Sequence, residues 1–226
     1  MTWMIDELAH AGPEHLDEAF VEGFDRKQGR PDAGPDIAVF QDHGLGAGVV
    51  VVDLGAGTGQ FALPAAGAFG RVVAVDVSPA MVAHLRSKAP GNVTVVQAGF
   101  LGYTHEGPPA DGVYTRHALH QLPDFWKALA LHRIAGLLRP GGVLRVRDLI
   151  YDFAPGETPQ VFDRWFAGAA TDPAAGYTAE DYSEHIRTEH STFRWLFEPM
   201  LEAAGFDVVD VSFDSRLYGA YTCVRR

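Results

Sequence analysis

The chain has 226 residues, of which 47% are hydrophobic and 21% are charged. This length favours one domain with a sizeable core, and the composition argues against a disordered chain. The 25 glycines and 14 prolines follow no Gly-x-y repeat, which excludes a collagen-like fibre. The net charge of −11 argues against nucleic acids and anionic membrane surfaces as partners.

Three features of the sequence predict a cytoplasmic protein. Cys223 is the only cysteine, so no disulfide can form within the chain, which fits a reducing compartment. The first residues have no basic stretch followed by an apolar one, so we expect no signal peptide. No run of 18 apolar residues occurs, so we also expect no membrane span.

The N-terminal part is acidic and has helical spacing. Residues 1–42 contain ten acidic and three basic residues, which we interpret as a solvated face. Four apolar residues between Pro13 and Lys27 lie on one stripe of a helix: Leu16, Phe20, Val21 and Phe24. A break rich in glycine and proline follows at 29–35, and a short helix is expected to end near His43. We predict that residues 1–45 form a helical cap.

From residue 49 the pattern changes to short β-branched runs separated by helical stretches. Five predicted strands share this character: Val49–Asp53, Val72–Asp76, Val93–Val96, Gly112–Tyr114 and Val143–Arg147. Such runs are typical of central strands in a parallel sheet. One helix is predicted to open at Ser78-Pro79, and another to span Asp124–Leu138 and end at Arg139–Gly142. The alternation predicts a parallel sheet with helices on both faces.

Residues 151–190 interrupt this alternation. Seven aromatic residues fall in the segment: Tyr151, Phe153, Phe162, Trp165, Phe166, Tyr177 and Tyr182. We predict an inserted helical lid here, with an oligomer interface as the alternative. A helix over about Thr192–Ala204, stopped by Gly205, and strands near Asp207–Phe213 and Leu217–Val224 complete the chain. The short link between those strands requires an antiparallel pair.

The strongest motif is Asp53-Leu-Gly-Ala-Gly-Thr-Gly59, at the end of the first predicted strand. Its glycines allow a tight turn and close approach of the backbone to a ligand. We expect a helix from about Thr58, with its N–H groups facing that ligand. A nicotinamide-binding loop has the pattern Gly-x-Gly-x-x-Gly, whereas here Gln60 takes the last position. Asp76 ends the second strand and can accept hydrogen bonds from both ribose hydroxyls; its alternative role is to start a helix.

Four segments, in order, resemble the successive motifs of class I S-adenosylmethionine-dependent methyltransferases. They are the Asp53–Gly59 motif, Asp76, the run Val95-Val-Gln-Ala-Gly-Phe100 and the turn Leu138-Arg-Pro-Gly-Gly142. The chain is similar in particular to the small-molecule "type 11" group, because Ala118-Leu-His-Gln-Leu-Pro123 is similar to that group's Leu-His-His-Leu-Pro. The resemblance covers about residues 49–150, and the C-terminal helix and strands fit the family's ending.

The resemblance implies a pose for S-adenosylmethionine. Gly55, Gly57 and Gly59 would pass under its methionine part, with Asp53 nearby. Asp76 would hold the ribose. Four further residues would complete the cofactor site: Val77 and Met81 beside the adenine, and Gly99 and Phe100 at its edge. Many members carry an acid near position 99, but Gln97–Leu101 contains none, so another side chain or the backbone must serve.

Arg116, His117 and His120 follow the fourth strand, at the edge where open α/β sheets place their ligands. Arg116 is assigned to the cofactor site. His117 and His120 are candidate general bases, since a histidine pKa lies near the working pH. The alternative for both is a structural role. We predict no metal site, because the sequence shows no third ligand at a suitable spacing. The Arg147-Asp148 pair is either a pocket element or an ion pair.

The prediction from sequence is a single methyltransferase domain over residues 1–226, with a doubly wound, seven-stranded, mostly parallel sheet. It divides into the cap at 1–45, a cofactor-binding half at 46–150, the lid at 151–190 and a C-terminal helix and strand pair at 191–226. The expected reaction transfers a methyl group from S-adenosylmethionine to a small molecule, with a homodimer as a possible assembly. The alternatives are a non-catalytic protein that binds this cofactor and a nicotinamide-dependent oxidoreductase.

Overall fold

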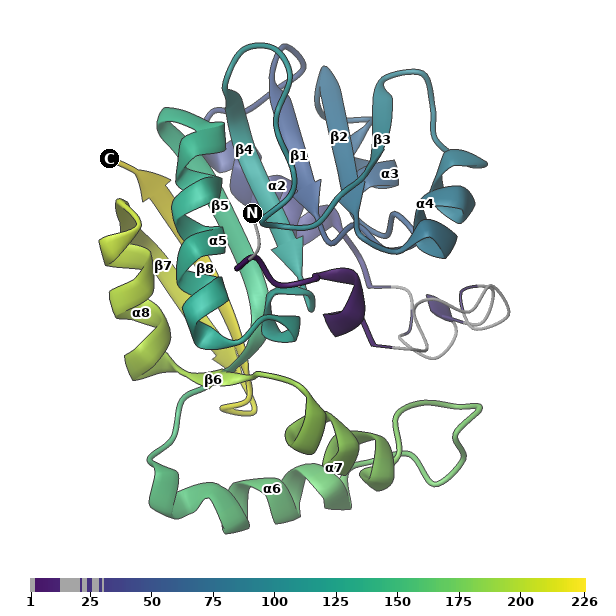
Figure 1. The fold of residues 1–226 in the computed structure, drawn as a ribbon, viewed down its shortest axis with the longest axis vertical. Helices are drawn as coiled ribbons and strands as arrows, with labels where there is room; N and C mark the ends of the chain where they lie inside the picture. The colour runs from purple at the N-terminus through teal and green to yellow at the C-terminus, as the bar shows by residue number, and fades with distance from the viewer. Residues whose placement is uncertain (1–2, 13–20, 22–23, 26–28, 30) are drawn as a thin grey trace.

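A computed structural model describes residues 3–12, 21, 24–25, 29 and 31–226. The helix predicted between Pro13 and Lys27 therefore lies largely outside the described residues. Within them, the chain forms a mixed α/β fold around one central sheet (Figure 1). The predicted fold class is confirmed.

Seven strands follow the order β3-β2-β1-β4-β5-β8-β7 across the sheet. Their bounds are Val50–Leu54 for β1, Arg71–Asp76 for β2, Val93–Gln97 for β3, Ala110–Arg116 for β4, Leu138–Tyr151 for β5, Phe206–Asp214 for β7 and Tyr218–Arg225 for β8. Strands β1 to β5 are parallel, and β8 is antiparallel to both β5 and β7. An eighth strand, β6 (Thr192–Phe193), pairs in parallel with the end of β5. The predicted antiparallel ending is confirmed.

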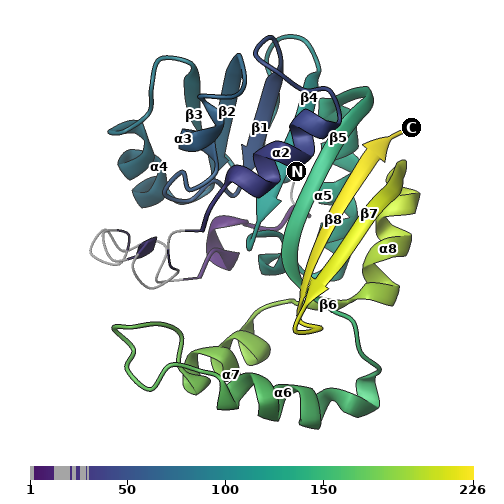
Figure 2. The ribbon, with the colours of Figure 1, turned by 180° about the vertical axis from the view of Figure 1, so that it is seen from behind.

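Helices cover both faces of the sheet because alternate strand residues are apolar and point to opposite faces. Val51 lies in a buried cluster with Phe40, on the face covered by α2 (Gly34–Asp42), α3 (Ala62–Ala65) and α4 (Pro79–Arg86). Val52 lies in the cluster of the other face, covered by α5 (Asp124–Leu137) and α8 (Arg194–Ala203). Figures 1 and 2 show these two layers from opposite sides.

Helix α4 begins where its sequence predicts. The Ser78 side chain accepts a hydrogen bond from the Met81 N–H at 3.1 Å, and Pro79 occupies the first turn. Helix α3 differs from the prediction, because it begins at Ala62 and not near Thr58. The left-handed φ of Gly57 (52°) and Gly59 (88°) prevents an earlier start.

The inserted segment, residues 151–190, contains two α-helices beyond the sheet edge toward which β1 and β4 point (Figure 1). They are α6 (Thr158–Ala167) and α7 (Ala179–Thr188). The following helix, α8, begins at Arg194 and not at Thr192, because Thr192 and Phe193 pair with β5. Among the described residues, no helix has the length and apolar character needed to cross a membrane.

Candidate active site

A cavity of about 1080 Å³ lies at the carboxyl ends of the parallel strands. Its wall is formed by residues 53–58 of the segment 53–59, which we call the glycine loop, by the ends of β2 and β4, by the N-terminal segment and by α7. Eleven of the twelve predicted site residues line it: Asp53, Gly55, Gly57, Asp76, Val77, Met81, Gly99, Phe100, Arg116, His117 and His120. The structure thus brings these eleven residues together around one cavity.

Gly59, the twelfth predicted residue, is not on the cavity wall. A Cβ atom there would lie 2.3 Å from Leu85 Cδ1, so Gly59 lets the loop pack against α4. At Gly57, in contrast, the nearest atom to an added Cβ is Phe24 Cε1, at 3.9 Å. Gly57 therefore combines a left-handed φ with an open approach to its backbone, as a ligand cradle requires.

Asp76 links the second strand to the glycine loop. Its Oδ2 accepts the N–H of Gly57 and its Oδ1 accepts the N–H of Ser78, both at 2.8 Å. The same carboxylate lines the cavity. Asp76 is therefore both the support of the loop and a hydrogen-bond acceptor at the wall, and the predicted alternative of a helix start describes part of its role.

Asp53 is the most unusual acid in the site. It is 2% exposed, and its Oδ2 has no hydrogen-bond partner among the described residues. Burial, and then the charge of Asp76, raise the pKa of Asp53 to about 8. A buried carboxylate oxygen without a donor costs stability unless a ligand satisfies it. Asp53 is thus a candidate acceptor for a polar or cationic ligand group.

Two acids of the N-terminal segment, Glu7 and Asp25, lie next to the predicted cofactor residues. The sequence did not identify either as part of the site. The Glu7 carboxylate lies over Gly99 and accepts the N–H groups of Leu101 and Gly102, at 3.0 and 2.9 Å. It places an acid where Gln97–Leu101 supplies none. Asp25 accepts hydrogen bonds from two side chains of or next to the glycine loop: Thr58 at 2.5 Å and Gln60 at 3.0 Å.

Arg116 and His117 lie at the end of β4. Arg116 lines the cavity, and its Nε is buried with no hydrogen-bond partner among the described residues. His117 has a φ of 47°, which is uncommon outside glycine, and its N–H donates to the Arg147 carbonyl at 2.8 Å. Burial lowers the pKa of His117 to about 3, so its imidazole is neutral at physiological pH.

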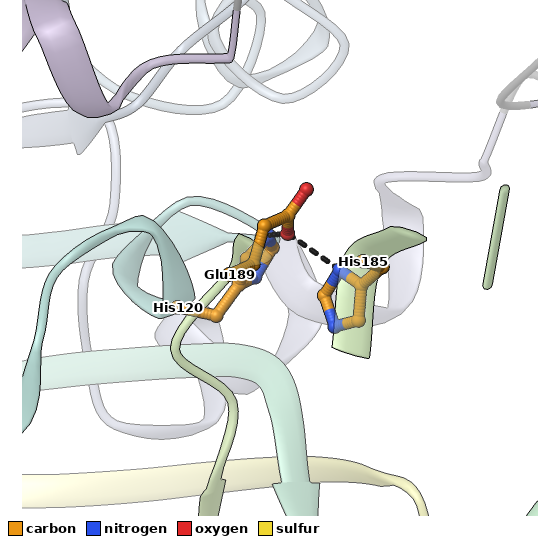
Figure 3. A group of neighbouring side chains, drawn as sticks. All are labelled: His120, His185 and Glu189. Carbon is orange, nitrogen blue, oxygen red and sulfur yellow. Dashed lines mark ion pairs between the residues drawn. The ribbon is translucent and has the colours of Figure 1, made fainter. Parts of the chain in front are cut away.

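His120 belongs to a chain of charged groups that crosses from the sheet to the inserted segment (Figure 3). Its Nδ1 lies 2.5 Å from Asp148 Oδ1, and its Nε2 lies 2.8 Å from Glu189 Oε2. That same oxygen lies 2.5 Å from Nδ1 of His185. Burial opposes a charge on His120, but Asp148 and then Glu189 outweigh it and raise the pKa of His120 to about 10.

This chain of contacts bears on two pairs of alternatives from the sequence. Asp148 and Glu189 favour the protonated form of His120, which suits a structural role better than that of a general base. Arg147 and Asp148 both line the cavity and do not pair with each other: Arg147 pairs with Asp36 at 3.1 Å, and Asp148 pairs with His120. His185 and Glu189 were missed because they are more than sixty residues from His120 in sequence.

The sequence matches the family described as "Methyltransferase domain" over residues 51–142. A methyltransferase of Geobacillus kaustophilus is 28% identical over 148 residues, which cover 62% of this chain and 69% of that one. A trans-aconitate 2-methyltransferase of Methylobacterium radiotolerans is 37% identical over 100 residues, 43% of this chain and 37% of that one.

Two solved structures illustrate the likeness of fold. A magnesium protoporphyrin IX methyltransferase from Synechocystis PCC 6803 with bound SAM has a TM-score of 0.66 at 17% identity, over 100% of both chains. The cyclase SpnF has a TM-score of 0.63 at 18% identity, over 84% of this chain and 80% of its own. At these identities the likeness concerns the fold alone.

The match over residues 51–142, the related methyltransferases and the similar folds support a class I S-adenosylmethionine-dependent methyltransferase. The cofactor of this class is S-adenosylmethionine. The residues present fit such a group, because Gly57, with its open backbone, and Asp53, with its unpartnered Oδ2, both line the cavity. The narrower assignment to the type 11 group stays a prediction.

Proposed function

We propose that the protein transfers a methyl group from S-adenosylmethionine to a small-molecule acceptor bound in the same cavity. The observation that carries this proposal is the size and extent of the cavity. Pockets for a single drug-sized ligand have volumes of roughly 300–1,000 Å³. At about 1080 Å³, this cavity exceeds that range, and it runs from the glycine loop to α7.

In this proposal the cofactor lies on the side of the glycine loop. Asp76 accepts the ribose hydroxyls, and the backbone at Gly57 passes beneath the methionine part. The free Oδ2 of Asp53 accepts from the cationic end of that part, which would satisfy its missing hydrogen bond. Glu7, next to Gly99, is the acid closest to the expected adenine edge.

The acceptor then lies on the side of β4, β5 and α7. Arg116, His117 and Arg147 line this part of the wall together with Tyr182. Because His117 is neutral and its pKa is about 3, it fits a hydrogen-bonding and positioning role better than proton removal near neutral pH. The predicted preference for His117 over His120 as a contributor to turnover stays a prediction.

When bound, S-adenosylmethionine supplies an electrophilic methyl group on a sulfonium ion. The chain's own contribution is to hold the nucleophile in line with that group and to exclude water. The glycine loop and Asp76 fix one reactant from the sheet edge. The inserted segment covers the acceptor side through residues of α7 that line the cavity. Positioning by two separate parts of the chain is therefore the proposed source of catalysis.

The test is turnover with a panel of metabolites, measured as release of S-adenosylhomocysteine. Polycarboxylates belong in the panel first, because one relative acts on trans-aconitate and because Arg116 and Arg147 face the cavity. Gly57→Val serves as the inactive control. The proposal predicts acceptor-dependent release from the native protein alone. Tight binding of S-adenosylmethionine without release for any acceptor would favour the non-catalytic alternative.

A further inference from the structure

Outside the expected cofactor positions, the cavity wall carries a compact group of three side chains: His120, His185 and Glu189 (Figure 3). Each offers one potential metal-ligand atom, and these atoms lie within 4.8 Å of one another. His120 comes from the segment after β4, whereas His185 and Glu189 come from α7 and the residue after it. The group forms only when the inserted segment lies against the sheet.

The far side of each imidazole ring is held by another residue. Nδ1 of His120 lies 2.5 Å from the Asp148 carboxylate, and Nε2 of His185 lies 2.7 Å from the Ser191 hydroxyl. The remaining ring nitrogens, Nε2 of His120 and Nδ1 of His185, both lie beside Glu189. Histidines that bind metals typically have this outer support, since it fixes the ring orientation and makes the free nitrogen more basic.

The carboxylate between the two rings is not satisfied by them. Oε2 of Glu189 lies 2.8 and 2.5 Å from the two ring nitrogens. It is nevertheless buried without a hydrogen bond of acceptable geometry to any described residue. The nitrogens are therefore close to the oxygen, but at angles outside those of a good hydrogen bond. A divalent cation that takes the place of the ring protons between these atoms would satisfy the carboxylate and use one lone pair of each ring.

We propose that His120, His185 and Glu189 bind a divalent transition-metal ion, such as Zn²⁺, that orients an oxygen-bearing acceptor. Two imidazoles and one carboxylate are a known ligand set for such ions, and three protein ligands leave a coordination position open. That position faces the cavity, because all three residues line it. Mg²⁺ is a poor candidate because it prefers oxygen ligands.

The ion deepens the proposed function, on which its role in turnover rests. An acceptor hydroxyl bound to the ion releases its proton to water more readily. The resulting oxygen anion can form the new O–C bond, while the C–S bond breaks and sulfur keeps its electron pair. The acceptor class is therefore a molecule that presents a hydroxyl or a carboxylate to a metal. Asp148 and Ser191 act as positioning residues for the two imidazoles.

The experiment is calorimetric titration of the metal-depleted full chain with Zn²⁺, with Mg²⁺ as a second probe. We expect one zinc ion per chain and no saturable binding of Mg²⁺. His185→Gln and Glu189→Gln should each weaken zinc binding at least tenfold. His132→Gln, which makes the same change at an exposed histidine of α5, should leave it unchanged. Absorption bands of bound Co²⁺ give a second readout on the native protein and do not depend on any variant.

Two outcomes would overturn the metal site. One is the absence of stoichiometric zinc binding, in which case His120 itself provides the positive charge between Asp148 and Glu189. The other is zinc binding that survives both ligand variants, which would place the ion elsewhere. Titration of the same samples with S-adenosylhomocysteine separates this proposal from the proposed function. If that ligand binds and zinc does not, only the metal site fails; if that ligand does not bind, the proposed function fails.

Discussion

The sheet and the inserted segment are built in different ways. Five residues of α5 are buried against the sheet: Lys127, Ala130, Leu131, Ile134 and Ala135. In α6 only Val161 is buried, and none of the residues described in α7 is. The inserted segment instead holds together through aromatic pairs, such as Trp165 stacked on Tyr182 at 4.3 Å, and through the ion pairs at Glu189.

The two sides of the cavity therefore differ in how firmly they are held. One side is the glycine loop, called here the rigid wall, and the other is the inserted segment, called here the adjustable wall. The glycine loop is fixed by backbone hydrogen bonds, since the N–H groups of Gly55 and Ala56 both donate to Val75. The opposite wall rests on few buried apolar contacts, and such regions open at low free-energy cost. A rigid wall suits a constant cofactor, and an adjustable wall suits the exchange of acceptor and product.

The largest effect is expected from Gly57→Val, which breaks the rigid wall. A β-branched residue at a φ of 52° is strained, and its side chain would extend into the cavity. We expect binding of S-adenosylmethionine to fall more than a hundredfold by calorimetry. Gly46→Val is the control, because Gly46 has open space around it and no positive φ. Normal binding by Gly57→Val would mean that the cofactor lies elsewhere.

The next largest effect is expected from Asp76→Ala. The variant loses the proposed ribose contacts, worth ~1.5–3 kcal/mol each as charge-assisted hydrogen bonds, and frees the N–H of Gly57. We expect affinity for S-adenosylmethionine to fall at least tenfold, with the fold retained by circular dichroism.

Asp111→Ala is its matched control. Asp111 likewise accepts a backbone N–H, from Val50 at 3.0 Å, but it lies at the opposite end of β1. Its loss should affect stability and leave cofactor affinity within about twofold. Equal losses of affinity in the two variants would show that any damaged aspartate loosens the sheet, and would remove Asp76 from the site.

Asp53→Asn tests how the stability of the rigid wall depends on pH. The folded protein holds the proton of Asp53 up to about pH 8, whereas the unfolded chain releases it near pH 3.8. Stability from this group is therefore present at low pH and lost as the pH rises through about 8. At pH 9 the cofactor-free variant should melt about 3–8 °C above the native protein, which corresponds to ~1–3 kcal/mol. At pH 5, which is closer to the pKa of the unfolded chain, the difference in melting temperature should be much smaller.

The same variant should bind S-adenosylmethionine more weakly at pH 9, where the native carboxylate is ionised and the neutral amide cannot pair with a cation. A stabilised but weakly binding protein is the expected signature of an acid kept for a ligand. A melting difference that is the same at pH 5 and pH 9 would contradict the raised pKa of Asp53.

The fold could be predicted from sequence because its signals are local. A β-branched run such as Val72–Asp76 has few alternatives to a buried strand, and Ser78-Pro79 specifies a helix start by itself. The start of α3 was wrong because the left-handed glycines override the helical pattern. Strand β6 could not be predicted, since two residues carry no periodicity and form a strand only beside β5.

The site residues also differ in whether a local sequence signal predicts them. The glycine loop and Asp76 are recognisable in sequence because adjacent residues share one task. Glu7 reaches Gly99 across more than ninety residues, and Glu189 reaches His120 across nearly seventy. Such contacts depend on how segments pack, and no spacing in a single sequence encodes them. The histidine pKa values follow the same rule, because they depend on burial and on partners such as Asp148.

The smallest effect is expected from Trp165→Leu, which loosens the adjustable wall. The Trp165–Tyr182 stack joins α6 to α7, and an aromatic pair contributes ~0.5–1.5 kcal/mol beyond its buried area. Amide exchange in α7 should accelerate about tenfold, which corresponds to ~1.4 kcal/mol, while α5 stays unchanged. Affinity for S-adenosylhomocysteine should change less than twofold.

Trp195→Leu, at an exposed residue of α8, is the control and should not affect α7. Faster exchange in both α5 and α7 would mean that the two regions unfold as one unit, and the comparison between a rigid and an adjustable wall would not hold. Unchanged exchange in α7 would instead assign its attachment to the Glu189 ion pairs, which His185→Gln would then release.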